Sequence, residues 1–361
     1  MIFTRRSFGS LFAAGVASRW APAEPFQDTG RRIGYCIVGL GRISMQHFMP
    51  ATKASKFARV TGIVSGHSDK ANKWAADYGV PANSIYNYQN FDAIADNKNI
   101  DAVYIALPNG MHSEYVIRAA KAGKHVLCEK PMSNTVEEGQ AMVDACRKAG
   151  KKLMIAYRCQ YEPVNMRAVQ LIRDGKIGKI EAIESSNGFN IKAGEWRLSK
   201  KLAGGGPMMD VGIYSLNACR FLTGEEPVEL KGYSSVIDKD GRFNEVEENL
   251  SWTMRFPSGA VASCNTSYGA NLPGFYRVHG SKGMIHMEPA FGYEGIHMKA
   301  NVPGEAPIDD LNPAKDPSQF VPEADDMAQA ILQNREPKAN GEEGLRDMKL
   351  MAAIYKSCGR G

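Results

Sequence analysis

The sequence lacks any apolar run long enough to cross a membrane. Its 361 residues contain no stretch that approaches the roughly 18 apolar residues of a membrane-spanning helix. It also lacks a strong charge, since 44 basic residues face 39 acidic ones and leave a net charge of +5. So small an excess gives no support for nucleic-acid binding. We therefore expect neither a membrane nor a nucleic acid among its partners.

Cysteines are few and scattered. Seven are present, an odd number, and no two are close in sequence: Cys36, Cys128, Cys146, Cys159, Cys219, Cys264 and Cys358. A disulfide framework or a zinc site would place cysteines at short, repeated spacings. Several of these instead fall in apolar runs, so we predict buried thiols and no metal site.

Acidic residues are absent from the first 23 positions, which carry Arg5, Arg6 and Arg19. The twin-arginine pattern 4–8 precedes a weakly apolar stretch and the small-x-small pattern Ala21-Pro22-Ala23, in the order of an export signal. We predict a twin-arginine signal peptide at 1–23, an arm at 24–32 and a periplasmic location. The alternative is a disordered basic tail on a cytoplasmic protein.

Short apolar runs alternate with helix-like segments up to about residue 157. The runs are 33–38, 59–64, 101–107, 125–128 and 152–156, and the helical segments are 43–55, 68–78, 113–122 and 135–149. This alternation predicts an α/β fold whose first domain, 33–157, is a Rossmann parallel sheet.

The pattern changes in the second half, 158–361, where one helix (163–174) precedes mostly strand-like runs. These are 179–187, 228–236, 246–256, 259–268, 274–279 and 283–288, followed by helices at 322–333 and 343–357. We predict an α+β domain with a mostly antiparallel open sheet, which binds substrate and supports oligomerisation.

A glycine turn follows the first strand and opens a helix: Gly39-Leu40-Gly41-Arg42-Ile43-Ser44. Gly39 permits a tight turn and Gly41 lets a pyrophosphate approach the backbone, as in dinucleotide-binding βαβ units. The second strand ends in Ser65-Gly66-His67-Ser68, and no carboxylate precedes Asp69. An NAD enzyme usually has an acid there, whereas hydroxyls with Lys70 and Arg42 suit a 2′-phosphate, so NADP is the predicted cofactor.

Three residues form a candidate proton-handling set. Lys130 lies just past the 125–128 strand, and Asp210 and Tyr214 are four apart in a segment that we expect to be helical from about Gly206. A tyrosine is a poor base unless a nearby ammonium lowers its pKa, and Lys130 is the expected source of that charge. Taken singly, each residue also fits an ordinary structural role. Their combination with a dinucleotide turn favours catalysis.

These motifs resemble the glucose–fructose oxidoreductase and inositol dehydrogenase family, above all its glucose–fructose and aldose–aldose branch. The resemblance covers roughly 32–358 and is carried by Gly39-Leu40-Gly41, Leu107-Pro108-Asn109 with His112, Glu129-Lys130-Pro131, Glu195-Trp196-Arg197-Leu198, 204–217 and 341–345. Inositol dehydrogenases have a catalytic histidine at this position. This chain has Tyr214 there and in this respect resembles the glucose–fructose branch.

The resemblance implies roles for individual residues. Lys130 would hydrogen-bond the reacting hydroxyl of a sugar, Tyr214 would take its proton, and Asp210 would help hold the sugar. The residues expected to contact the cofactor are Gly39, Gly41, Arg42, Ile43, Ser65, Gly66, Lys70, Leu107, Pro108, Asn109, His112, Glu129 and Lys130. Arg158, Tyr161, Trp196 and Arg197 are the expected lining of the sugar pocket.

The implied activity is a ping-pong hydride transfer in which an aldose is oxidised at C1 to its lactone and a second sugar is reduced to an alditol. Two alternatives stay open: an exported NAD-dependent glycosidase of the same fold, and a non-catalytic sugar or nucleotide sensor. The open sheet predicts a homodimer or homotetramer.

Overall fold

The computed structural model describes residues 30–312 and 319–360. The predicted signal peptide and all of the arm before Gly30 lie outside the described residues. Within the described parts, no helix is both long and apolar enough to span a membrane.

A six-stranded parallel sheet forms the first domain, as the alternating pattern predicts. Its strands are β1 (Ile33–Val38), β2 (Ala58–Val64), β3 (Ile85–Tyr86), β4 (Ala102–Ile105), β5 (His125–Glu129) and β6 (Leu153–Ala156), in the order β3-β2-β1-β4-β5-β6. Every residue of β1, β4 and β6 is buried, because helices cover both faces of such a sheet. The order reverses between β1 and β4, where ligands of doubly wound folds bind at the carboxyl edge.

The helices of this domain begin and end where the sequence indicates. They are α1 (Met49–Ala54), α2 (Ser68–Tyr78), α3 (His112–Lys121) and α4 (Val136–Lys148), with short turns at η2 (Ala82–Ser84), η3 (Phe91–Asp96) and η4 (Asn109–Met111). A capping box starts α4, in which the Thr135 hydroxyl accepts from the Glu138 amide and the Glu138 carboxylate accepts from the Thr135 amide. The helix expected at 43–55 is present but contains a π-helical turn, η1 (Ser44–Phe48).

An eight-stranded sheet forms the second domain. Its strands are β7 (Ile180–Gly188), β8 (Glu229–Ser235), β9 (Asn249–Arg255), β10 (Val261–Ser267), β11 (Phe275–Gly280), β12 (Met284–Met287), β13 (His297–Asn301) and β14 (Ile308–Leu311), in the order β14-β13-β12-β11-β7-β10-β9-β8. Only the β7–β10 pair is parallel among the pairings of the described strands. The strands β13 and β14 were not predicted.

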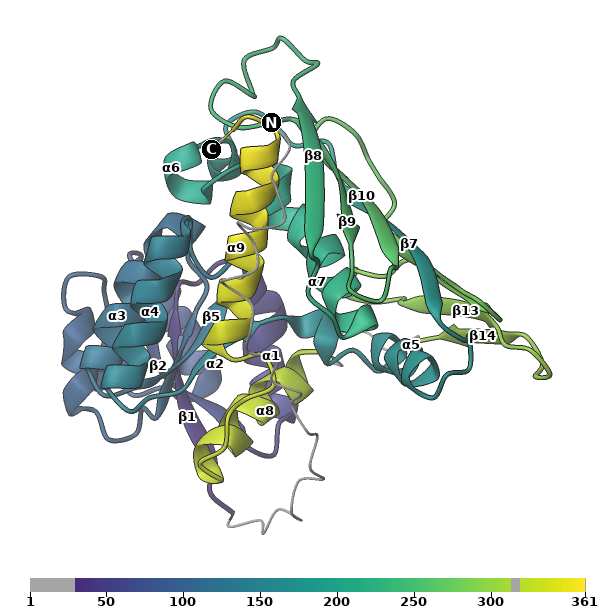
Figure 1. Ribbon diagram of the computed structural model, residues 1–361. Helices are drawn as coiled ribbons and strands as arrows, with labels where there is room; N and C mark the ends of the chain where they lie inside the picture. Colours follow the sequence, from purple (N-terminus) through teal and green to yellow (C-terminus); the bar gives the residue numbers. More distant parts are fainter. Residues whose placement is uncertain (1–29, 313–318, 361) are drawn as a thin grey trace. The chain divides into compact units, whose positions relative to one another are not determined.

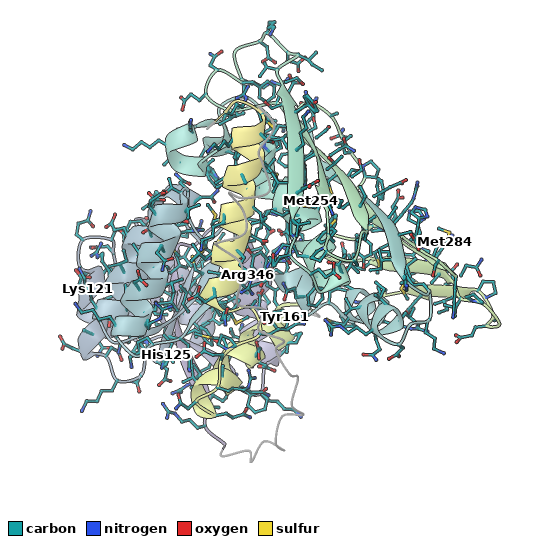
Figure 2. All side chains as sticks on the ribbon, in the orientation of Figure 1. Lys121, His125, Tyr161, Met254, Met284 and Arg346 are labelled. Atoms are coloured by element: carbon teal, nitrogen blue, oxygen red, sulfur yellow. The ribbon has the colours of Figure 1, made fainter. Side chains whose placement is uncertain are left out.

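Helices cover one face of this sheet and leave the other open. The helical elements are η5 (Arg158–Gln160), α5 (Pro163–Arg173), η6 (Trp196–Leu198), α6 (Lys200–Ala203), η7 (Met208–Gly212) and α7 (Ile213–Thr223). Along β9 the residues alternate between buried and exposed, as expected of a sheet with one solvated face. Met254 on the covered face and Met284 on the open face are both marked in Figure 2.

The last two helices return to the first domain, although the sequence assigned them to the second (Figure 1). They are α8 (Phe320–Leu332), which packs on α1, and α9 (Gly341–Ser357), which packs on α4 and β6 and also on β8. The buried hydroxyl of Tyr35 on β1 donates to the carbonyl of Ala324 on α8 (3.0 Å). The α9 helix therefore contacts both sheets.

Candidate active site

The glycine turn lies between β1 and η1 at the carboxyl edge of the parallel sheet. Gly39 has φ +94°, and a Cβ there would lie 2.6 Å from the carbonyl oxygen of Ala106, so only glycine fits. A Cβ on Gly41 would meet nothing nearer than 4.0 Å. Gly41 and Arg42 are exposed and Ile43 is half-buried. The open backbone at Gly41 thus fits the close approach of a pyrophosphate.

The end of β2 lies beside this turn. The buried hydroxyl of Ser65 accepts from the amide of His67 (3.1 Å), and Gly66 is exposed next to the Tyr88 ring. The Lys70 ammonium donates to the carbonyl of Leu40 (2.5 Å), which places a cation at the glycine turn itself. Arg42 is bound to Gln46 (3.0 Å) on the exposed side. Two cations without an intervening acid fit a 2′-phosphate.

Two further turns follow β4 and β5, and His112 joins them. One ring nitrogen of His112 contacts the carbonyl of Leu107 and the other that of Pro131, each at 2.9 Å. Burial lowers the pKa of His112 to about 4, although the two carbonyls oppose the shift. His112 is 0% exposed and holds the two turns together, while its predicted contact with the cofactor stays a prediction.

The remaining residues of these two turns are also fixed by protein contacts. The side-chain amide of Asn109 donates to the carbonyl of Ala203 (2.9 Å), and Glu129 accepts from the Tyr104 hydroxyl (2.5 Å). Burial raises the pKa of Glu129. Pro108, Glu129 and Lys130 are half-buried, so this edge of the sheet presents a rigid, partly accessible surface next to the glycine turn.

Asp210 lies on the π-helical turn η7, where it meets three side chains. The Lys130 ammonium donates to its backbone carbonyl (2.6 Å) and lies 3.5 Å from Oδ1. Arg197 Nε and the Tyr268 hydroxyl donate to Oδ2 at 2.8 and 2.9 Å. Burial alone would raise the pKa of Asp210, but the Lys130 and Arg197 cations hold it below its usual range. Asp210 is therefore an ionised anchor for Lys130.

Tyr214 is the second residue of α7 and lies against two cations. Lys130 Nζ is 4.5 Å and the Arg158 guanidinium carbon 5.0 Å from the ring centre. The expectation that an ammonium lowers the pKa of Tyr214 is wrong for this structure, because burial raises that pKa. The opposing charge that matters most is Arg158 and not Lys130.

The four expected sugar-pocket residues divide into two pairs. The Arg158 guanidinium is buried and donates to the carbonyls of Phe291 (2.6 Å) and Gly292 (2.8 Å) and to Gln319 Oε1 (2.6 Å). The Tyr161 hydroxyl is bound to Asp326 (2.9 Å). Their polar groups therefore face protein.

The other pair is accessible. Trp196 and Arg197 are half-buried, with the Arg197 guanidinium carbon 4.7 Å from the centre of the Trp196 ring. Arg197 also reaches Asp210 directly, so this pair remains placed to meet a ligand beside the Lys130–Asp210 contact.

Sequence reasoning missed the segment 289–296 between β12 and β13. Its Phe291 ring lies 5.7 Å from that of Tyr214, and its Tyr293 ring stacks on His47 of η1 at 4.1 Å. Arg158 lies over Tyr293 at 4.4 Å. No periodic pattern marks this segment, so only the tertiary structure brings its aromatic rings to Tyr214.

Two family models match the chain. Residues 33–157 match the model described as an oxidoreductase family with an NAD-binding Rossmann fold, and residues 165–286 match the GFO/IDH/MocA C-terminal domain.

Similar proteins match over nearly the whole chain. D-xylose 1-dehydrogenase (NADP(+)) of Haloarcula marismortui is 33% identical over 335 residues, which cover 91% of this chain and 92% of that protein. The crystal structure of aldose-aldose oxidoreductase from Caulobacter crescentus complexed with glycerol is 42% identical, with a TM-score of 0.88, and the match covers 92% of this chain and 98% of that one. The 1,5-anhydro-D-fructose reductase of Ensifer adhaerens is 26% identical over 333 residues, 90% of this chain and 96% of that protein.

Proposed function

The chain belongs to the GFO/IDH/MocA oxidoreductase family and is an NADP-dependent sugar oxidoreductase, and we propose that it works by ping-pong hydride transfer. In this proposal an aldose is oxidised at C1 to its lactone, and a second sugar is then reduced to an alditol without release of the cofactor. The 42% identical aldose-aldose oxidoreductase supports this choice over a simple dehydrogenase.

The residues of the carboxyl edge fit the cofactor. The open backbone at Gly41 suits the pyrophosphate, and Lys70 and Arg42 suit the 2′-phosphate. NADP held there by Gly41, Lys70 and Arg42 would supply reversible hydride-transfer chemistry for C1 of the aldose and for the carbonyl of the second sugar.

Side chains of the protein carry out the proton transfers. Lys130, held by the Asp210 carbonyl, donates a hydrogen bond to the C1 oxygen and stabilises the negative charge that develops there. Once deprotonated, the Tyr214 oxygen takes the C1 hydroxyl proton, and the Arg158 guanidinium offsets part of the burial that raises the pKa of this phenol. In the second half-reaction the same phenol returns a proton to the new alditol oxygen, so protons balance over one cycle. Trp196 and Arg197 bind the sugar hydroxyls.

The observation that carries this proposal is the position of the Lys130 ammonium. It lies between the Asp210 carbonyl and the Tyr214 ring, on the turn that His112 links to Leu107 at the cofactor edge. A solvated lysine would have no such partners. The two alternatives fit less well, because a glycosidase dependent on NAD expects an acid after β2 and a histidine-centred site, and a sensor needs no proton-transfer set.

In this proposal the segment 1–23 directs export to the periplasm, which offers no pool of NADP. The cofactor must therefore be regenerated in place. The test is to record absorbance and fluorescence of the protein as purified, without added nucleotide, and then to add a panel of aldoses. We expect the signal of reduced nicotinamide to rise with one aldose and to fall when a second sugar is added. Protein that is free of nucleotide, or that releases it after each reduction, would contradict the ping-pong cycle.

A further inference from the structure

The two elements that carry the proposed base and its cation are also joined by a second contact. The turn η5 carries Arg158 and Gln160, and α7 carries Tyr214 and Asn217. Gln160 Nε2 donates to Asn217 Oδ1 at 3.0 Å, and both side chains are buried. The Arg158–Tyr214 contact and the Gln160–Asn217 hydrogen bond thus connect the same pair of elements.

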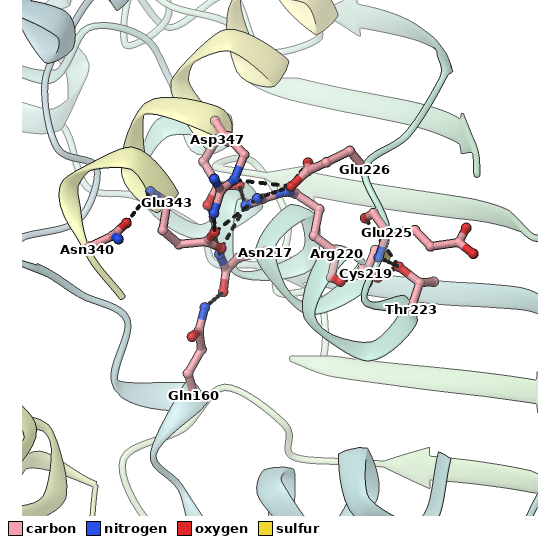
Figure 3. Close-up of polar contacts among 11 residues, drawn as sticks. Gln160, Asn217, Cys219, Arg220, Thr223, Glu225, Glu226, Asn340, Glu343 and Asp347 are labelled. Atoms are coloured by element: carbon pink, nitrogen blue, oxygen red, sulfur yellow. Dashed lines mark hydrogen bonds and ion pairs between the residues drawn. The ribbon is translucent and has the colours of Figure 1, made fainter. Parts of the chain in front are cut away.

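A carboxylate on α9 fixes which way the Asn217 amide faces. Asn217 Nδ2 donates to Asp347 Oδ2 at 2.9 Å, and the Asp347 carboxylate can only accept (Figure 3). The amide oxygen must therefore face Gln160. Asp347 is 0% exposed and is itself held by Arg220 Nη1 through Oδ1 at 2.5 Å. Burial raises the pKa of Asp347 to about 6, although Arg220 opposes that shift.

Arg220 makes this anchor rigid. Its guanidinium also binds Glu343 of α9 (3.0 Å) and Glu226 beyond the end of α7 (2.6 Å), and its side chain is 3% exposed. A buried cation with three carboxylate partners holds one geometry more firmly than a surface ion pair does. Arg220 therefore fixes α7 to α9 one turn beyond Asn217.

Gln160 and Asn217 lie close to Tyr214, the proposed base. A small cavity of about 20 Å³ is lined by Gln160, Asn217 and Tyr214 among other side chains. Asn217 lies three residues after Tyr214, on the same face of α7. A shift of η5 relative to α7 would change the 5.0 Å separation between the Arg158 guanidinium and the Tyr214 ring directly.

We propose that Gln160 and Asn217 are positioning residues for the Arg158–Tyr214 pair, with Asp347 orienting the Asn217 amide. The inference rests on the proposed function, in which Tyr214 is the base. The titratable and charged groups that face Tyr214 are Arg158 and Cys159 on η5, Glu129 at the end of β5, Lys130 just after it, Asp210 on η7 and Tyr293 in 289–296. Of these, Arg158 is the cation on η5, the element that Gln160 holds to α7.

The test measures the pH dependence of kcat for aldose oxidation in Gln160→Met, which keeps the volume and removes the hydrogen bond. In a plot of log kcat against pH, the rising limb reports deprotonation of Tyr214. We expect this limb to move to higher pH by about half a unit to one unit, and kcat near pH 7 to fall roughly 3- to 10-fold. NADP affinity should stay within twofold. Asn217→Asp, which turns an amide into a carboxylate facing Asp347, should shift the limb in the same direction.

Ser215→Ala is the matched control. It removes another buried hydrogen bond of α7, between the Ser185 and Ser215 hydroxyls (2.8 Å), while Ser185 still donates to the Phe275 carbonyl (2.8 Å). This variant should leave the limb in place. In an Arg158→Lys background, Gln160→Met should produce a smaller shift than in the wild type, because the two residues act through one contact.

A limb that stays in place in Gln160→Met, or that moves equally in Ser215→Ala, would overturn the positioning role. A kcat lowered by the same factor on the plateau above the limb as below it would do so as well, since that pattern reports general loss of structure. Tyr214→Phe measured in parallel separates the two proposals: if it retains turnover and the limb, then Tyr214 is not the base and the proposed function itself fails.

Discussion

At the scale of single residues, the site depends on charges that are buried but paired. Asp210 stays ionised because Lys130 and Arg197 surround it, whereas burial raises the pKa of Tyr214 despite Arg158. The types and spacing of Lys130, Asp210 and Tyr214 predicted them as a candidate set, and the structure brings the three together. It could not identify Arg158 as the cation that opposes the shift of Tyr214, because that contact depends on where η5 meets α7.

Replacing Tyr214 by Phe tests the assigned base. The change removes the hydroxyl and keeps the ring that packs against Lys130 and Phe291. We expect kcat for aldose oxidation to fall roughly 100- to 10,000-fold, since that is the usual contribution of a positioned acid or base. Fluorescence titration should find NADP affinity unchanged within about twofold. Turnover that survives the change would reassign the base.

His47 makes the stability of the fold depend on pH. Burial and the neighbouring Arg158 and Arg42 lower the pKa of His47 to about 4. The unfolded chain, with a pKa near 6.5, therefore binds the proton more tightly. The stabilisation from neutral His47 is fully present above about pH 6.5 and is lost as the pH falls towards 4, by up to about 3 kcal/mol.

Urea unfolding between pH 7 and 4.5 measures this effect. His47→Phe retains an aromatic ring between Tyr293 and Phe320, and it should lose less stability on acidification than the wild type. His286→Gln, on the open face of the sheet, serves as the control and should follow the wild type. Identical pH dependence in the His47 variant and the wild type would rule out a protonation effect at this position.

At the scale of elements, the sequence predicted regular structure well and its interruptions poorly. Helices with strong end signals, such as α2 and α4, lie within one or two residues of their predicted bounds. The π-helical turns η1 and η7 were not foreseen, since the apolar spacing of a helix with one wide turn differs little from that of an ordinary helix. The strands β13 and β14 are four or five residues long and carry little pattern.

Alanine at either glycine of the first turn should have a different effect. At Gly39 it should lower the stability of the fold, and at Gly41 it should lower the affinity for NADP. Gly39→Ala forces a side chain at φ +94° to within 2.6 Å of the Ala106 carbonyl, so we expect a stability loss of about 1–3 kcal/mol. Gly41→Ala has room within the protein and should unfold within about 0.5 kcal/mol of the wild type. Its NADP affinity should fall at least about tenfold, because the methyl group would occupy the space that we assign to the pyrophosphate.

Urea unfolding of nucleotide-free protein and fluorescence titration with NADP measure the two effects separately. An alanine at Gly41 that binds NADP as tightly as the wild type would place the cofactor elsewhere. An alanine at Gly39 with unchanged stability would show that the turn relaxes more easily than its geometry indicates.

At the scale of the whole molecule, the open face of the eight-stranded sheet exposes several large apolar side chains. Tyr233, Val261, Met284 and Leu311 are 68, 45, 37 and 54% exposed, and the strand register places all four on this face. We propose that a second copy of the chain covers it, since apolar residues gathered on one face often mark an interface.

Sedimentation velocity tests this arrangement. Val261→Arg combined with Tyr233→Asp should shift the protein towards monomer, because charges would be buried against the partner. Ile237→Arg is the matched control: Ile237 is 70% exposed but lies outside the strands, and it should leave the assembly unchanged. A double variant that sediments like the wild type would exclude this face as the interface.

The return of α8 and α9 to the first domain affects how the chain is made. The partners of Tyr35 and of the α4 surface are encoded more than 160 positions after β6 ends, so the ribosome needs on the order of ten to forty seconds to supply them. We therefore expect the nucleotide-binding half to complete its packing only after α8 and α9 have been made. For the same reason, a gene fusion that exchanges this half between relatives should transplant residues 33–157 together with 320–357, so that α1, α4 and β6 keep the helices that pack on them.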